Sequence, residues 1–173
     1  ICTELVQNGW IGGAGGPMGP DPRELAESDL IIVWGGNPVS TQVNVMAHIS
    51  RARKDRGAKL VVIDAYQSPT AEVADDVLLV QPGTDGAVAC AIMHVLFRDG
   101  LADEPYMEKY TDNWRELKEH LQYKTPVWAE KISGVSCQKI EALAREIGKT
   151  ERTYIRIGYG FARSRNGASQ VLS

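Results

Sequence analysis

The stretch that decides the fold is DLIIVWGGNPVST, residues 29 to 41, in which an apolar run stops at two glycines, an asparagine and a proline. A helix-like segment follows from about Gln42 to Arg56, and a second apolar run, AKLVVIDA, spans residues 58 to 65. This spacing is typical of a β-α-β unit, so we expect parallel strands. Both runs are almost continuously apolar, as strands covered by helices on both faces require. We therefore predict an α/β fold with a parallel, Rossmann-like, three-layer sheet.

The same order repeats further along the chain. TAEVADD (residues 70 to 76) is expected to form a short helix, and VLLVQPG (77 to 83) a third strand. The segment from 84 to 100 should be a long helix with Thr84 as its N-cap. Its apolar residues recur at helical spacing and predict a buried stripe of Val88, Ala91, Ile92, Val95 and Leu96.

Three further segments complete the predicted organisation. The helix after Ser136 leads into a fourth strand, TYIRIGYG, at residues 153 to 160. The first two dozen residues are rich in Gly and Pro and lose helical periodicity after about Gly9, which predicts a loop. Residues 103–135 are polar and aromatic and are predicted to be a helical connecting lobe. We predict that residues 1–173 form a single α/β domain.

Composition excludes several classes of protein. Hydrophobic residues make up 43% of the chain, charged residues 24%, and the net charge is -3, so neither nucleic-acid binding nor a membrane surface is indicated. No apolar run reaches the roughly 20 residues of a membrane span. The three cysteines form no CxxC pair and no zinc-type spacing. The chain begins without Met, in mid-pattern, which suggests a segment of something longer.

Four apolar strands share one feature, in that each ends in Gly, Pro, Asp or Asn. In an open parallel sheet these ends lie along one edge, outside which ligands bind. Gly35 and Gly36 would let backbone approach a ligand, and Asn37 and the helix start after Thr41 suit phosphate oxygens. Asp64 is placed to accept hydrogen bonds from ribose hydroxyls. Thr84 and Asp85 would meet a base edge, since a carboxylate matches the N–H pair of guanine.

Structural alternatives compete with these assignments. Strand-end glycines are common in turns, and Asp85 could simply cap its helix. GKT at residues 148 to 150 lacks the upstream glycine of a phosphate loop, because Leu143 stands there. No Ser, His and acid constellation can be argued. Four strand ends of the same kind nevertheless favour a nucleotide-like ligand.

Longer stretches resemble one family along essentially the whole chain, the molybdopterin oxidoreductases of the dimethyl sulfoxide reductase superfamily. The stretches, in order, are ESDLIIVWGGNPVST, GAKLVVID, ADDVLLVQPGTDGA, GLADEPYMEKYT, ISGVSCQKIEALARE and GYGFARSRNGA. In that family two pyranopterin guanine dinucleotides clamp one molybdenum or tungsten atom, which cycles between the +4 and +6 states during oxygen-atom or electron transfer. The resemblance implies that this chain is a fragment of such an enzyme and is inactive alone.

The resemblance also implies which residues bind this molybdopterin guanine dinucleotide. Residues 34 to 41 would line phosphates and pterin, 64 to 68 the ribose, 83 to 85 the guanine, and 158 to 163 the pterin near the metal. The implied cofactor-binding residues are Trp34, Gly35, Gly36, Asn37, Pro38, Thr41, Asp64, Tyr66, Ser68, Gly83, Thr84, Asp85, Gly158, Tyr159, Gly160 and Arg163. Tyr66 stands where the family usually has Arg. Cys2 is a candidate Mo or W ligand by its position before the first strand, or else a small packing residue.

The remaining expectations concern parts outside this chain. The family resemblance implies a 4Fe-4S cluster in an N-terminal region, remaining domains of the parent enzyme, a small-molecule substrate and an electron-transfer subunit, in the cytoplasm or periplasm of a prokaryote. No nucleic acid and no membrane insertion are expected. The main alternative is a stand-alone nucleotide-binding regulatory module without redox activity, and the third is a structural subunit that has lost the cofactor.

Overall fold

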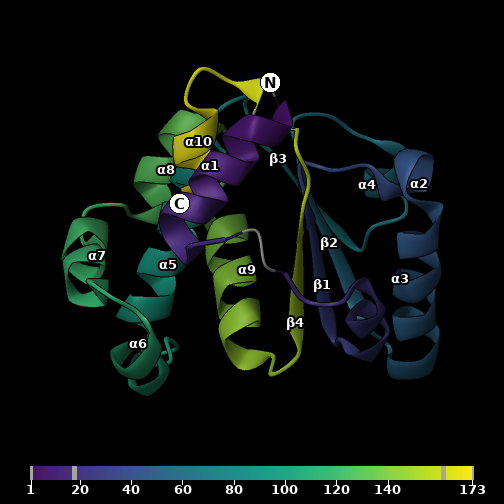
Figure 1. The fold of residues 1–173 in the computed structure, drawn as a ribbon, viewed down its shortest axis with the longest axis horizontal. Coiled ribbons are helices and arrows are strands. Elements are labelled where there is room, and N and C mark those ends of the chain that lie inside the picture. Colours follow the sequence, from purple (N-terminus) through teal and green to yellow (C-terminus); the bar gives the residue numbers. More distant parts are fainter. Residues whose placement is uncertain (1, 17–18, 161–162, 173) are drawn as a thin grey trace.

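The structure is a computed structural model that describes residues 2–16, 19–160 and 163–172, with the backbone alone at residues 2, 3 and 5. The described residues form one sheet of four parallel strands in the order β3-β2-β1-β4 (Figure 1). The strands are β1 (Leu30–Trp34), β2 (Lys59–Asp64), β3 (Asp76–Leu79) and β4 (Thr153–Ile157). The predicted α/β class and parallel strands are confirmed.

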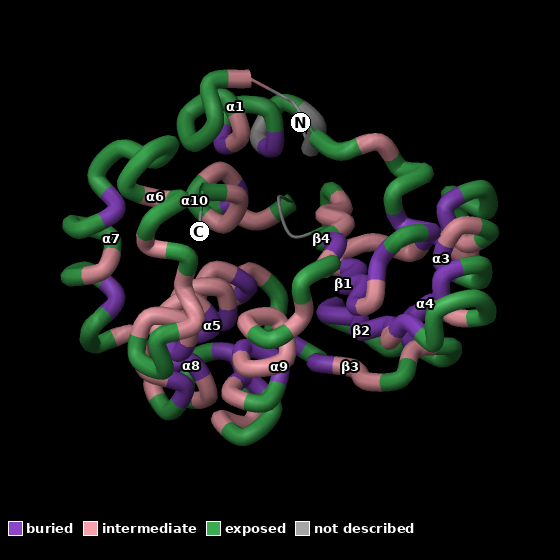
Figure 2. The backbone as a smooth tube through the Cα atoms, turned by 90° about the horizontal axis from the view of Figure 1, so that it is seen from below, coloured by how far each residue is buried: buried purple, intermediate pink, exposed green. Residues whose placement is uncertain are grey.

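Both faces of the sheet are covered, and the central strands alternate between two apolar cores. Ile31 and Val33 pack on one side against α3 (Val43–Arg56), with α4 (Pro69–Glu72) and the 3₁₀-helix η1 (Pro22–Glu27) beside it. Leu30 and Ile32 pack on the other side against α5 (Asp85–Arg98), α8 (Pro126–Ser133) and α9 (Cys137–Lys149). Figure 2 shows β1 and β2 as the buried centre between these layers.

The predicted stripe of α5 is buried at four of its five positions, and Leu96 is partly buried. Thr84 and Ser136 occupy the N-cap positions of α5 and α9, but neither side chain caps its helix. The Thr84 hydroxyl instead donates to the carbonyl oxygen of Gln81. These two residues therefore mark where the helices begin, but neither supplies a capping hydrogen bond to the first turn, although this bond was predicted for Thr84.

The chain after β1 contains one helix more than the sequence suggested. A single turn, α2 (Pro38–Thr41), begins at the proline, and α3 starts two residues after it ends. Proline at the first helical position has its φ already set for a helix, which explains the extra turn. Gln42, with φ -143°, separates the two helices.

Residues between α5 and α8 form two short helices, α6 (Glu104–Tyr110) and α7 (Trp114–Leu121), which lie on the side of α5 away from the sheet (Figure 1). The helix α8 packs closely on α5, and its Ala129 is fully buried in the core. Assignment of residues 103–135 as a connecting lobe stays a prediction. None of the described helices is long and apolar enough to cross a bilayer.

The prediction that the first two dozen residues form a loop is wrong for most of them. Residues 2 to 14 form helix α1 (Cys2–Ala14), and η1 begins after Asp21, whose carboxylate and Glu24 form a capping box. Helix α1 packs along α10 (Gly167–Leu172). At Gly9 a Cβ would lie 2.8 Å from the Ala168 carbonyl oxygen, so the missing side chain permits this close packing. Tertiary contact thus overrides the low helix propensity of glycine.

Candidate functional site

The carboxyl ends of all four strands meet in one cleft of about 260 Å³, which we call the strand-end cleft. Each strand contributes the residues that follow it, so the predicted convergence is confirmed. The residues that line the cleft are Gly35, Asp64, Ala65, Tyr66, Pro82, Gly83, Asp85, Gly160, Arg163 and Ser164. Seven of these ten were predicted from the sequence. A cleft at the carboxyl edge of a parallel sheet is the usual ligand position for this topology.

Two buried carboxylates face this cleft. Asp64, at the end of β2, is 8% exposed and accepts a hydrogen bond from the Ala65 N–H at 2.7 Å. Burial raises its pKa; the Ala65 hydrogen bond opposes this rise, and the neighbouring charge of Asp85 adds to it. Asp85, the first residue of α5, is 4% exposed, and burial raises its pKa as well. Buried acceptors of this kind suit a ligand that brings hydroxyl or N–H donors.

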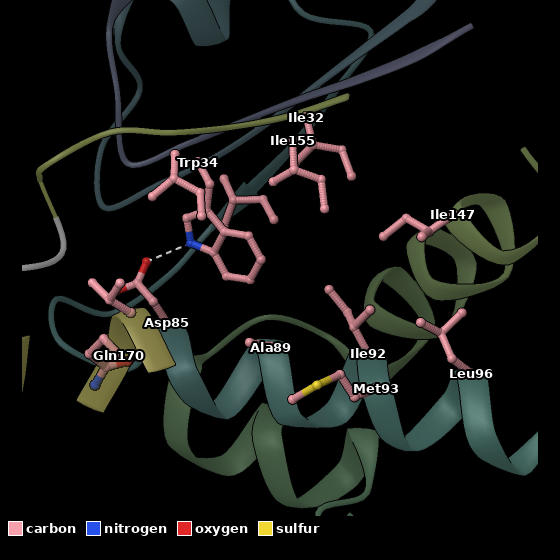
Figure 3. A pocket seen from close by; sticks show the side chains of 13 residues that line it. Ile32, Trp34, Asp85, Ala89, Ile92, Met93, Leu96, Ile147, Ile155 and Gln170 are labelled. Atoms are coloured by element: carbon pink, nitrogen blue, oxygen red, sulfur yellow. Dashed lines mark hydrogen bonds between the residues drawn. The ribbon is translucent and has the colours of Figure 1, made fainter. Parts of the chain in front are cut away.

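Asp85 receives its hydrogen bond from an unexpected donor, the indole of Trp34 at the end of β1. The Nε1–H of Trp34 donates to Oδ1 of Asp85 at 2.9 Å (Figure 3). This bond opposes the effect of burial on the Asp85 pKa. No sequence pattern indicates that the two side chains meet, since 51 positions separate them.

Below this bond lies a second space, a cavity of about 240 Å³ between the sheet and α5, which we call the apolar cavity. Trp34 and Asp85 stand at one end of it, beside Gln170 of α10 (Figure 3). The other lining residues are aliphatic apart from Met93: Ile32, Ile63, Ala89, Ile92, Leu96, Ile147, Ile155, Ile157 and Val171. Asp85 lines both spaces and so forms part of the wall between them.

The predicted glycines have a structural role of their own. The N–H of Gly158 donates to the Trp34 carbonyl at 2.7 Å, and that of Gly160 to the Gly35 carbonyl at 3.1 Å. The Cα of Gly158 is so placed that a Cβ there would approach the Gly36 Cα to 2.8 Å. These glycines therefore let two strand ends pack backbone against backbone. Their predicted contact with phosphates is a separate matter and stays a prediction.

Asn37 joins the turn after β1 to helix α4, which follows β2. Its Nδ2 donates to Ser40 Oγ at 3.1 Å, and its Oδ1 accepts from Thr70 Oγ1 at 2.8 Å. Thr41 Oγ1 donates to the Asn37 carbonyl at 2.9 Å. Ser68 is fully buried and accepts from the Ala71 N–H at the start of α4. The side chains of Asn37 and Ser68 thus shape the edge of the sheet.

The other predicted residues lie around the cleft rather than in its lining. Pro38 is buried in α2, Thr41 is exposed, and Tyr159 is half-exposed on the far side of β4 near α1. The side chain of Cys2 lies outside the described part of the chain, so its proposed role as metal ligand stays a prediction. Among the described residues, no group of three or more His, Cys, Asp or Glu could hold a metal ion.

Sequence reasoning missed Gln170, which contacts the loop after β3 from above. Its Nε2 donates to the Gly83 carbonyl at 2.7 Å, and its Oε1 accepts from the N–H of Gly86. Asn166 Nδ2 reaches the same Gly83 carbonyl at 3.4 Å. No pattern in the sequence indicates this contact, because Gln170 lies beyond the stretch GYGFARSRNGA (residues 158 to 168) that carries the family resemblance.

Comparison with known proteins shows to which family the chain is similar. A family model described as molybdopterin oxidoreductase matches residues 10–171. A probable oxidoreductase of Bacillus subtilis is 40% identical over 99% of this chain and 25% of its own length. A probable dimethyl sulfoxide reductase chain of Escherichia coli is 34% identical over 86% of this chain and 21% of its own length. The chain therefore spans about a quarter of the length of the curated relatives it matches.

The solved structure of acetylene hydratase from Pelobacter acetylenicus has the same fold, with a TM-score of 0.83 over 98% of this chain and 23% of that one. Sequence identity is 21%, so this likeness speaks for the fold alone. The family model covers all four strands and the helices between them, including every strand end of the cleft. The chain belongs to the molybdopterin oxidoreductase family.

Proposed function

We propose that this chain is the part of a molybdenum or tungsten oxidoreductase that binds the guanosine half of a molybdopterin guanine dinucleotide in the strand-end cleft. The observation that carries the proposal is the pair Asp64 and Asp85, two buried carboxylates at neighbouring strand ends. Of the described residues, no cation forms an ion pair with either one. Burying such carboxylates is costly unless a ligand supplies donors.

The hydrogen-bonding groups of the cleft fit a guanosine. Asp64 would accept from the ribose hydroxyls, as the carboxylate after the second strand does in dinucleotide-binding sheets. Asp85 would accept from the N–H pair of guanine. Arg163 lines the same cleft and is exposed, so its guanidinium is available to a phosphate or to the pterin. Asn37 and the single turn of α2 would lie along the pyrophosphate.

When bound, the cofactor supplies the redox chemistry, in which the metal alternates between the +4 and +6 states. The residues of this chain bind and orient it, and the buried carboxylates fix the base and the sugar at a distance from the reacting atom. Other parts of the enzyme would contain the 4Fe-4S cluster and the other half of the cofactor cleft. Those parts would also contact the electron-transfer subunit and the small-molecule substrate.

Calorimetry with GDP, a surrogate for the guanosine and pyrophosphate, tests the proposal. We expect saturable binding by the purified protein, weakened at least tenfold in Asp85→Asn and in Asp64→Asn, because each loses a charge-assisted hydrogen bond. Asp112→Asn, an exposed acid on the connection between α6 and α7, is the matched control and should bind like the native protein.

ADP serves as the comparison ligand, since adenine lacks the N–H pair that a carboxylate at Asp85 would accept. Equal affinity for GDP and ADP, or binding unaffected by both cleft variants, would contradict the proposal. A second measurement uses the cofactor itself. Hydrolysis of the pyrophosphate in a bound guanine dinucleotide releases GMP, so the full-length enzyme, purified with its cofactor, should yield GMP together with pterin and molybdenum or tungsten.

A further inference from the structure

We propose that Trp34 is a positioning residue for Asp85, and that its indole N–H aligns the carboxylate that receives the guanine base. The inference rests on the proposed function, because Asp85 needs alignment only if a ligand binds to it. The inference goes beyond the proposed function because it assigns the alignment of Asp85 to Trp34. The family resemblance had placed Trp34 beside the phosphates and pterin rather than beside the base.

The geometry gives Trp34 a fixed position from which to act. It is the last residue of β1, and its ring packs against the apolar core formed by the sheet with α5, α8 and α9. Asp85 begins α5 and lies in the wall between the strand-end cleft and the apolar cavity (Figure 3). A rigid donor at 2.9 Å from Oδ1 fixes the rotamer of this carboxylate. A fixed rotamer lowers the entropy lost when a ligand binds.

The electrostatic surroundings of Asp85 make the indole N–H of Trp34 important for its ionisation. Asp85 faces the apolar cavity on one side, where the other lining residues carry no charge. On the cleft side the titratable groups are Asp64, Tyr66 and Arg163. Among the described side chains, Trp34 is the one that donates a hydrogen bond to Asp85. Burial raises the Asp85 pKa and the Trp34 bond opposes that rise, so the indole favours the ionised form.

Ionisation decides what Asp85 can recognise. An ionised carboxylate accepts two N–H groups, such as N1–H and the exocyclic amine of guanine, whereas a protonated one carries a donor of its own. Binding of guanine should therefore be strong above the Asp85 pKa and weaken as the pH falls through it. Without the indole N–H the pKa rises further, and this weakening should begin at a higher pH.

Trp34→Phe removes the N–H and keeps an aromatic ring in the core. We expect the GDP affinity of this variant to approach the native value at about pH 8 and to fall below it near the native midpoint, by about fivefold if the pKa of Asp85 rises by one unit. Asp85→Asn should bind weakly at every pH. IDP, which lacks the exocyclic amine, should lose less affinity than GDP in Trp34→Phe.

Trp128→Phe is the matched control. Trp128 packs against the same apolar core from α8, and its loss of an indole N–H leaves Asp85 untouched. It should shift neither the midpoint of GDP binding nor the discrimination between GDP and IDP. Thermal melting of both variants checks that they fold.

A second measurement uses the native protein and needs no folded variant. The indole N–H resonance of Trp34 in a nitrogen-15 spectrum should titrate with the protonation of Asp85 and should move when GDP is added. In Asp85→Asn the same resonance should no longer titrate. A Trp34 signal that ignores both pH and GDP would overturn the inference.

The outcomes separate the inference from the function on which it rests. If the native protein binds no GDP at any pH, the proposed function and the inference fall together. If the native protein binds GDP and Asp85→Asn does not, but Trp34→Phe keeps the native pH profile, only the inference falls. An equal loss in Trp34→Phe at every pH and for both nucleotides would mean that Trp34 acts by packing alone.

Discussion

The backbones of Gly158 and Gly35 are in such close contact that a Cβ atom at Gly158 would lie 2.1 Å from the Gly35 carbonyl oxygen. Gly158 follows β4 and Gly35 follows β1, and the two strands are paired in register up to this point. The contact brings the loop after β4 over the end of β1. The position of Gly160 and Arg163 in the strand-end cleft therefore depends on the absence of a side chain at Gly158.

Gly158→Ala should destabilise the protein by about 3 kcal/mol, because an added methyl group meets backbone that cannot move aside. Denaturant unfolding measures this as a lower midpoint with an unchanged slope. Gly19→Ala is the control, since a Cβ there meets nothing within 4 Å, and it should change stability little. A Gly158→Ala variant as stable as Gly19→Ala would show that the two strand ends are not packed as described.

The two buried acids of the cleft should lower the stability of the ligand-free protein. Burial raises both pKa values in the folded state above those in the unfolded chain. At neutral pH the ionised carboxylates are therefore less favourable in the folded state than in the unfolded chain. By linkage, this cost is present above the folded pKa and disappears as the pH falls below the unfolded pKa.

Asp64→Asn and Asp85→Asn should therefore raise the melting temperature at pH 7 while weakening ligand binding. Each amide oxygen can still accept the existing hydrogen bond, from the Ala65 N–H or the Trp34 indole. A gain of about 1 kcal/mol would raise the melting temperature by about 2 to 4 °C in a domain of this size. The gain should shrink toward pH 3. An equal gain at both pH values would point to a cause other than ionisation.

Gln170 joins α10 to the cleft, because its amide bridges the Gly83 carbonyl and the Gly86 N–H. Gln170→Glu replaces the donor by a second oxygen facing that carbonyl. Leaving the Gly83 carbonyl without the Gln170 donor costs about 1 to 3 kcal/mol. The frequency of local opening of α10 should therefore rise by about tenfold or more. Hydrogen exchange should accelerate in α10, and in α1 which packs on it, but not in β1 or β2.

Gln122→Glu makes the same change of charge at an exposed position that ends α7, and should leave exchange in α10 unaltered. If Gln170→Glu exchanges like this control, the docking of α10 does not depend on the amide.

The sequence predicted the sheet well because its signals are local and strong. Continuous apolar strands, helical stripes and strand-end glycines each determine structure within a few residues, and parallel topology then brings the ends to one edge. The Trp34 indole on Asp85 and the Gln170 bridge to Gly83 could not be predicted in the same way. Both hydrogen bonds join segments more than 50 positions apart. No periodic pattern in the sequence indicates which residue is the partner.

The wrong loop prediction for residues 2 to 14 leads to a test in which two substitutions should change the stability in opposite directions. Gly9 and Gly12 both lie inside α1, where alanine is favoured over glycine by about 1 kcal/mol. At Gly12 a Cβ would meet only Leu172 Cδ2 at 3.5 Å, which is ordinary contact. At Gly9 it would lie 2.8 Å from both the Ala168 carbonyl oxygen and Val171 Cβ.

Gly12→Ala should therefore stabilise the protein by up to about 1 kcal/mol, whereas Gly9→Ala should destabilise it because α1 is pushed off α10. Thermal unfolding measures the direction of each change in stability, and hydrogen exchange in α10 shows whether α1 and α10 have separated. Stabilisation by both changes would mean that helix propensity alone governs α1. Destabilisation by Gly9→Ala alone would show that packing against α10 makes these glycine-rich residues helical.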